Sequence, residues 1–174
     1  MPSDLANSLS NFLCSGAEED FAPLFEELYP RIRRFFCTYP SVAEISDELT
    51  QDTLLVVFQR AKSVCRNESF LAWTFKVARN IMLQHVRKAH PETQLGNCHL
   101  STLGSCPFFE GSRLEDLISP LDPVSRDIVV LRFVEEFSYA EIAEALDLPI
   151  GTVKWKLFDA KARLAHTLAR KEFA

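Results

Sequence analysis

The spacing of apolar residues constrains the fold of this chain more than any other feature of its sequence. Residues 17–38, 41–61 and 69–88 each carry apolar side chains three or four positions apart, the pattern of an amphipathic α-helix. Alternating β-branched runs are scarce, and the 174 residues include only 5 glycines, which argues against sandwiches, barrels and glycine-rich nucleotide folds. The sequence therefore predicts an all-α protein.

A segment without helical periodicity divides the chain into two predicted domains. Residues 89–112 contain two prolines and three glycines, and a loop of this length is unusual inside one domain. We expect a flexible linker here, joining a helical bundle at 18–88 to a second small helical domain at 113–174. Residues 1–17 are expected to be a weakly ordered lead-in.

Prolines and capping residues predict where individual helices break and begin. Pro30 lacks an amide hydrogen and clashes with the preceding turn, so we expect it to kink or divide the first helix. In the second domain we expect a short helix near 113–118. A further helix is expected to open at Asp122 and Pro123, a capping residue followed by proline, and to run to about Glu136.

Cysteine content and hydropathy predict the compartment. The five cysteines are odd in number and include no C-x-x-C pair, which does not suit a disulfide scaffold. No run approaches the roughly 18 apolar residues of a membrane helix, and the first residues do not resemble a signal peptide. We expect a cytoplasmic protein with no direct membrane insertion.

The formal net charge of -5 conceals a strong polarisation of charge along the chain. Residues 149–174 carry six Lys and Arg against two acids. Residues 73–90 contain no acid and four bases, Lys76, Arg79, Arg87 and Lys88. One basic stretch is usually a solvated helix face, but two in separate predicted domains favour a nucleic acid as the partner.

A predicted helix-turn-helix lies in the second domain. Ser138 and Glu141 form a capping box that opens a short helix, and Asp147 suits the turn that ends it. A second helix starts near residue 150. The small Ala143 lets the two helices approach, and Val153 supplies an apolar contact.

The second of these helices has two distinct faces. Its buried stripe is expected to contain Val153, Leu157, Ala160, Leu164 and Leu168. The opposite side carries polar, charged and aromatic residues, namely Thr152, Trp155, Lys156, Asp159 and Arg163, and Lys154 and Lys161 flank it. That mixture can reach base edges and phosphates from the major groove, while the competing interpretation is an ordinary amphipathic terminal helix.

In the first domain, Lys76, Asn80, Leu83 and Arg87 share one helical face, with Arg79 at its edge. Aromatic residues, including Trp73, precede this face. Cations beside aromatic rings suit single-stranded DNA, because phosphates and unstacked bases both find partners there. The alternative is that the aromatic residues are simply core.

Three segments resemble bacterial sigma factors of the extracytoplasmic-function (ECF) group of the sigma-70 family. FLAWTFKVARNIMLQHVRK is similar to regions 2.3 and 2.4, AEISDELTQDTLLVVFQRA to region 2.2, and LDPVSRDIVVLRFVEEFSYAEIAEALDLPIGTVKWKLFDAKARL to region 4. The resemblance implies a promoter-specific initiation factor that binds core RNA polymerase, recognises the −35 and −10 elements of promoter DNA, and assists melting. It also implies a small, membrane-linked anti-sigma factor as a partner.

The resemblance assigns residues to these tasks. The region 2.2 residues expected to bind core polymerase are Asp47, Glu48, Gln51, Asp52 and Leu55. The segment 62–69 matches a loop that holds a flipped −10 base. The residues expected at the −10 element are Arg66, Asn67, Trp73, Lys76, Arg79, Asn80, Arg87 and Lys88.

Three residues depart from the family pattern. Trp155 stands where small or polar residues are common, Asp147 where a turn glycine is frequent, and Asp159 where a base is frequent. Asp159 either accepts a hydrogen bond from a cytosine amino group or lies at the groove edge. Asp147 requires little of the backbone, because aspartate visits left-handed geometry.

Other functions are less well supported. A one-component helix-turn-helix regulator with a sensing bundle would bind duplex DNA without polymerase. A metal or redox switch at His90, Cys98, His99 and Cys106 matches no usual zinc spacing. No P-loop, H-E-x-x-H or G-x-S-x-G motif is present, so we expect neither an enzyme nor a cofactor.

Overall fold

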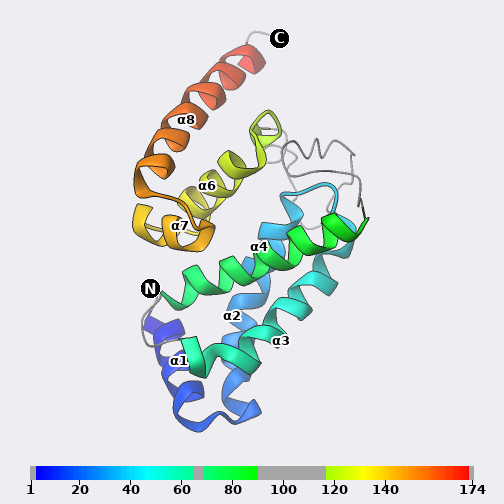
Figure 1. Cartoon of the computed structure of the whole chain (residues 1–174), viewed down its shortest axis with the longest axis vertical. Coiled ribbons are helices and arrows are strands. Elements are labelled where there is room, and N and C mark those ends of the chain that lie inside the picture. Colours follow the sequence, from blue (N-terminus) through cyan, green and yellow to red (C-terminus); the bar gives the residue numbers. More distant parts are fainter. Residues whose placement is uncertain (1–2, 65–68, 90–116, 173–174) are drawn as a thin grey trace. The chain divides into compact units, whose positions relative to one another are not determined.

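A computed structural model describes residues 3–64, 69–89 and 117–172 (Figure 1). These residues are mostly helical and include no strand, so the predicted all-α class is confirmed. The chain divides into two compact units, Met1–Ser105 and Cys106–Ala174. In the described part, no helix has the length and apolar character needed to span a membrane. The linker and most of the short helix predicted at 113–118 lie outside the described residues, and the domain boundaries stay predictions.

The first unit is a helical bundle with an aromatic core. Its described elements are α1 (Ser3–Ser15), α2 (Glu18–Cys37), the 3-10 helix η1 (Ala43–Ile45), α3 (Ser46–Val64) and α4 (Phe70–Ala89). α2 packs against α1 and α3, and α3 also packs against α4 (Figure 1). The ring of Phe35 contacts those of Phe36, Tyr39 and Phe75 at centroid distances of 5.8, 5.7 and 5.6 Å.

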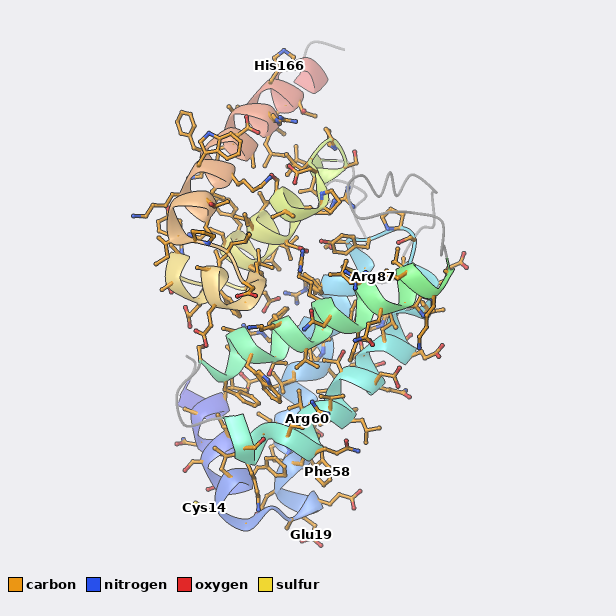
Figure 2. The ribbon with its side chains drawn as sticks, viewed as in Figure 1. Cys14, Glu19, Phe58, Arg60, Arg87 and His166 are labelled. Atoms are coloured by element: carbon orange, nitrogen blue, oxygen red, sulfur yellow. The ribbon has the colours of Figure 1, made fainter. Side chains whose placement is uncertain are left out.

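The expectation of a weakly ordered lead-in is wrong for residues 3–15, which form α1. Leu5 and Phe12 of this helix are buried. The Phe12 ring lies 5.0 Å from that of Phe21 on α2 and 5.5 Å from that of Phe58 on α3, which Figure 2 labels. Burial of these apolar side chains stabilises a helix that is too short to be stable alone.

Pro30 does not divide the first helix, because α2 is continuous from Glu18 to Cys37, and the alternative of a kink at Pro30 stays a prediction. Leu28 and Ile32, on either side of the proline, are fully buried. Their packing holds both turns in place although a backbone hydrogen bond is lost. The helix predicted over 41–61 begins only at Ser46, after η1.

The second unit contains three described helices, α6 (Pro123–Phe133), α7 (Tyr139–Leu146) and α8 (Ile150–Glu172), and α8 packs against the other two. Its core is mainly aliphatic and includes Ile128, Val130, Leu131, Ile142, Val153 and Leu157. Asp122 caps α6 as predicted, accepting a hydrogen bond from the Ser125 amide. The helix ends before Glu136, because that residue has a left-handed backbone (φ 59°) that an α-helix cannot contain.

Candidate nucleic-acid interface

The start of α7 and the turn between α7 and α8 have the geometry predicted from the sequence. The Ser138 hydroxyl accepts a hydrogen bond from the Glu141 amide (3.2 Å), and the Glu141 carboxylate accepts one from the Ser138 amide (2.9 Å). Asp147 adopts the left-handed conformation (φ 57°, ψ 49°), and the Leu148 amide bonds to the Ala143 carbonyl at 2.9 Å. The contacts of Asp147 and Leu148 end α7 in a tight turn just before α8, as a helix-turn-helix requires.

The buried stripe of α8 is shorter than predicted. Val153, Leu157 and Ala160 are buried, but Leu164 is half-buried and Leu168 is 49% exposed. α8 has 23 residues, whereas α6 has 11 and α7 has 8, so the two shorter helices cannot cover its whole length. The N-terminal half of α8 is therefore the part that the fold holds rigidly.

The side of α8 opposite this stripe, the outward α8 face, exposes two aromatic rings. Trp155 is 63% exposed and Phe158 is 76% exposed. Lys154 and Arg163 are also exposed, whereas Thr152, Lys156 and Asp159 are half-buried. Sequence reasoning missed Phe158, although its position three residues after Trp155 places it on the same side of a helix.

Three of the charged residues predicted on the outward α8 face, Lys156, Asp159 and Arg163, form ion pairs within the protein. Lys156 Nζ lies 3.2 Å from Oδ1 of Asp122, the residue that caps α6. Burial acts to raise the pKa of Asp122, but hydrogen bonds from Ser125 and Lys156 outweigh it and hold that pKa below its ordinary value. Arg163 Nε lies 2.8 Å from Oδ2 of Asp159, one helical turn away. Asp159 therefore has a cation beside its carboxylate.

Cations close to aromatic rings surround the start of α8. The Lys154 ammonium lies 6.0 Å from the centroid of the Tyr139 ring, and the Arg132 guanidinium lies 5.2 Å from the same centroid. Lys156 Nζ lies 5.8 Å from the Trp155 ring. These contacts position the positive charges near the N-terminal turns of the helix.

The predicted single-strand surface on α4 separates into exposed polar residues and buried rings. Asn80 and Arg87 are exposed, and Lys76 is half-buried (Figure 2 labels Arg87). Trp73 is only 8% exposed, and its ring lies 6.2 Å from that of buried Phe70. The tryptophan is thus placed as core, one of the two interpretations that the sequence left open. Of the remaining predicted residues, Arg79 is half-buried and Lys88 is exposed.

The predicted polymerase-binding residues lie on α3. Asp47, Glu48, Gln51, Asp52 and Leu55 are all exposed, and Leu55 has 55% of its surface accessible. Asp47 Oδ1 lies 2.6 Å from Arg33 Nε and also accepts a hydrogen bond from the Tyr29 hydroxyl. The hydrogen bond from Arg33 and, to a smaller extent, the one from Tyr29 hold the pKa of Asp47 below its ordinary value. The hydrogen bond that the Tyr29 hydroxyl donates to Asp47 also raises the pKa of Tyr29.

Arg66 and Asn67, two of the predicted −10 residues, lie outside the described residues. The alternative metal or redox group of His90, Cys98, His99 and Cys106 also lies outside them.

Comparison with known families identifies both units. The sequence model of Sigma-70 region 2 matches residues 24–91, and that of Sigma-70 region 4 matches residues 112–164, so the two matches together span most of the chain. The chain belongs to the sigma-70 family. Region 4 includes the helix-turn-helix of α7 and α8, and region 2 includes α3 and α4.

Curated relatives of this sigma factor belong to the ECF group, and so does this chain. It is 27% identical over 163 residues to the ECF RNA polymerase sigma factor RpoE of Cereibacter sphaeroides, covering 87% of this chain and 88% of the relative. It is 21% identical over 170 residues to the ECF RNA polymerase sigma factor SigW of Bacillus subtilis, covering 88% and 91%. An ECF sigma factor is a promoter-specific transcription initiation factor.

Solved structures share the fold. The sigma factor RpoE of Bartonella quintana, crystallised with the anti-sigma factor NepR, has a TM-score of 0.70 at 24% identity, covering 87% of this chain and 98% of that chain. CnrH, solved with the cytosolic domain of CnrY, has a TM-score of 0.67 at 21% identity, covering 95% of each chain.

Proposed function

We propose that this sigma factor directs core RNA polymerase to promoters through three surfaces. The outward α8 face reads the −35 element, the polar side of α4 contacts the −10 element and assists melting, and the exposed face of α3 binds core polymerase. The observation that carries the proposal is the helix-turn-helix of α7 and α8, which fixes a helix with exposed cations in a chain matching both sigma-70 regions.

The −35 assignment rests on charge and rigidity. Lys154 and Lys156 lie in the first turns of α8, and the first turn contains no acid. Cations at the groove edge neutralise phosphates, and the buried stripe beneath them holds the helix in one orientation. Thr152 lies in the same turns and supplies a hydroxyl within the groove.

The −10 assignment rests on Lys76, Asn80 and Arg87. A displaced strand offers phosphates to the two cations and base edges to the amide, which has both donors and an acceptor. The buried position of Trp73 makes these polar groups the main contacts in this proposal. Asn80→Ala is expected to impair open-complex formation more than closed-complex binding. Equal activity of the variant, relative to wild type, on premelted and duplex templates would remove Asn80 from melting.

The polymerase assignment rests on the exposed carboxylates and Leu55 of α3. This combination fits a partner surface with both basic and apolar side chains. Asp52→Lys should weaken binding to core polymerase while the fold is retained, because an exposed charge seldom carries stability. Unchanged affinity would place the core contact elsewhere.

Regulation and location follow from the family. RpoE of Bartonella quintana was crystallised with an anti-sigma factor, and we propose such a partner, small and membrane-linked, for this chain. We also propose that the protein acts in the cytoplasm and provides no catalytic site of its own. Purification from the native host without induction should recover the partner, and recovery of the chain alone or only with polymerase would count against it.

Reconstitution with core polymerase tests the function as a whole. The chain is mixed with core polymerase and genomic fragments, and transcript starts are mapped. We expect initiation at a small set of sites that share upstream elements. Strong operator binding without polymerase, and no new starts with it, would instead favour a one-component regulator.

A further inference from the structure

The outward α8 face is unusually apolar for a helix that meets nucleic acid. Gly151, Trp155, Phe158 and Ala162 are all exposed, and their spacing of four, three and four positions places them on one side of the helix. Trp155 (63%) and Phe158 (76%) are the two most exposed large apolar side chains of the described residues, and their position on one side of the same helix indicates a binding surface. The rings contribute little to the core, since Val153, Leu157 and Ala160 occupy the opposite side.

The charges around these rings favour duplex DNA as the occupant. Residues 150–158 contain Lys154 and Lys156 and no acid. The segment opens the second helix of the helix-turn-helix, the part that enters a major groove. A protein partner would need to bury the Lys154 ammonium, whereas the phosphates of a groove pair with it.

Three of the charged side chains beside the two rings form ion pairs within the protein. Asp159 pairs with Arg163, and Lys156 pairs with Asp122. The C5-methyl group of thymine is the apolar feature of base edges in the major groove, and it suits contact with an exposed ring. We infer that Trp155 and Phe158 are specificity-determining residues that contact thymine methyl groups in the −35 element. This inference rests on the proposed function.

The test removes one methyl group at a time. Wild-type holoenzyme, formed with core polymerase, selects its preferred upstream element from a random library, and each thymine in the element is then replaced by deoxyuridine. The dT-to-dU change keeps base pairing and deletes only the methyl group. We expect binding to weaken about fourfold at one or two positions, the effect of one methyl group leaving an apolar contact.

Variants assign the effect to each ring. Trp155→Ala should bring the dT/dU affinity ratio at its position to about one, Phe158→Ala should do the same at a neighbouring position, and Trp155→Phe should keep part of the ratio. The matched control is Phe133→Ala, which removes an exposed ring on α6 and should leave every ratio unchanged. Because the two rings on α8 are exposed, the variants should retain the fold, and circular dichroism checks this.

The possible failures are distinguishable. If holoenzyme selects no upstream element, the proposed function is contradicted and the inference falls with it. If an element is selected but contains no thymine, or if deoxyuridine binds as well as thymine, the methyl contact is overturned while the function stands. Ratios that persist in both alanine variants would overturn the roles of Trp155 and Phe158, and loss of core polymerase binding in these variants would indicate a protein contact instead.

Discussion

Trp73 in the first unit has Lys76 three residues after it, and Trp155 in the second stands between Lys154 and Lys156 in the sequence, yet the surroundings of the two rings differ. Trp73 is 8% exposed and packs near Phe70, whereas Trp155 is 63% exposed. The first unit uses its aromatic rings to fill the core, and the second has a mainly aliphatic core and leaves rings on its surface. The residue type beside a cation therefore does not decide its role. Burial by the neighbouring helices does.

The largest expected effect is the loss of a core ring in the first unit. Phe35 is 1% exposed, and Phe35→Ala should lower the free energy of unfolding by about 3–5 kcal/mol, because it removes buried apolar surface and leaves a cavity. Urea unfolding measures this. Phe25→Ala, in the same helix but half exposed, is the control and should cost clearly less. Equal losses for the two variants would contradict an aromatic core centred on Phe35.

The second unit depends more on a cap than on rings. Ser138→Ala removes one half of the capping box and should cost about 1 kcal/mol in the free energy of unfolding, whereas Ser138→Thr should retain most of it. Phe158→Ala should cost less than Ser138→Ala, within about 0.5 kcal/mol. Thermal unfolding compares the three. A larger loss for Phe158→Ala than for Ser138→Ala would show that the ring is structural.

Lys154 and Lys156 are expected to differ in their contribution to DNA binding. Lys154→Ala should reduce the salt dependence of promoter binding by about one counterion. Lys156→Ala should change it less, because Asp122 already offsets its charge. Promoter binding by holoenzyme over a series of salt concentrations measures both slopes. Equal changes would mean that the pair with Asp122 opens on DNA.

The smallest expected effect concerns pH. Hydrogen bonds from Arg33 and Tyr29 lower the pKa of Asp47 in the folded state. The contribution of Asp47 to the free energy of unfolding is therefore complete above its unfolded pKa and is lost as the pH falls through its folded pKa. The side chain is exposed, so the contribution is a few tenths of a kcal/mol. In Asp47→Asn, the urea midpoint of unfolding should therefore fall slightly less than in the wild type as the pH is lowered from about 5 to about 3. Glu48→Gln, at the neighbouring position, serves as the control. A steeper fall of the urea midpoint with decreasing pH in Asp47→Asn than in the wild type would contradict the pairing of Asp47 with Arg33.

Local chemistry made part of this molecule predictable. The Ser138 and Glu141 box, the left-handed Asp147 and the capping Asp122 each follow from backbone groups within a few residues, and the structure has all three. Features set by distant contacts were not predictable. α1 forms because Phe12 meets Phe21 and Phe58, which belong to two other helices, the second of them 46 positions away.

The candidate site shows the same division. Helical spacing placed Trp155 outward correctly, but the pairing of Lys156 with Asp122 joins residues 34 positions apart and left no trace in the sequence pattern. The burial of Trp73 was likewise open, because helical spacing identifies only one buried side of a helix. In the structure, the first turns of α4 are buried on all sides. The reach of α8 beyond its partners, which exposes Leu168, depends on the lengths of other helices.

The most direct test of the central claim, that the outward α8 face meets promoter DNA, is site-specific photocrosslinking. The photoreactive amino acid p-benzoylphenylalanine replaces Trp155 in one holoenzyme and Phe133, an exposed ring on α6, in another. Each holoenzyme is irradiated on a mapped promoter and the adducts are located. The probe at position 155 should crosslink to the −35 element, and the probe at position 133 should not. Adducts from position 155 on polymerase subunits alone, with none on DNA, would contradict the claim.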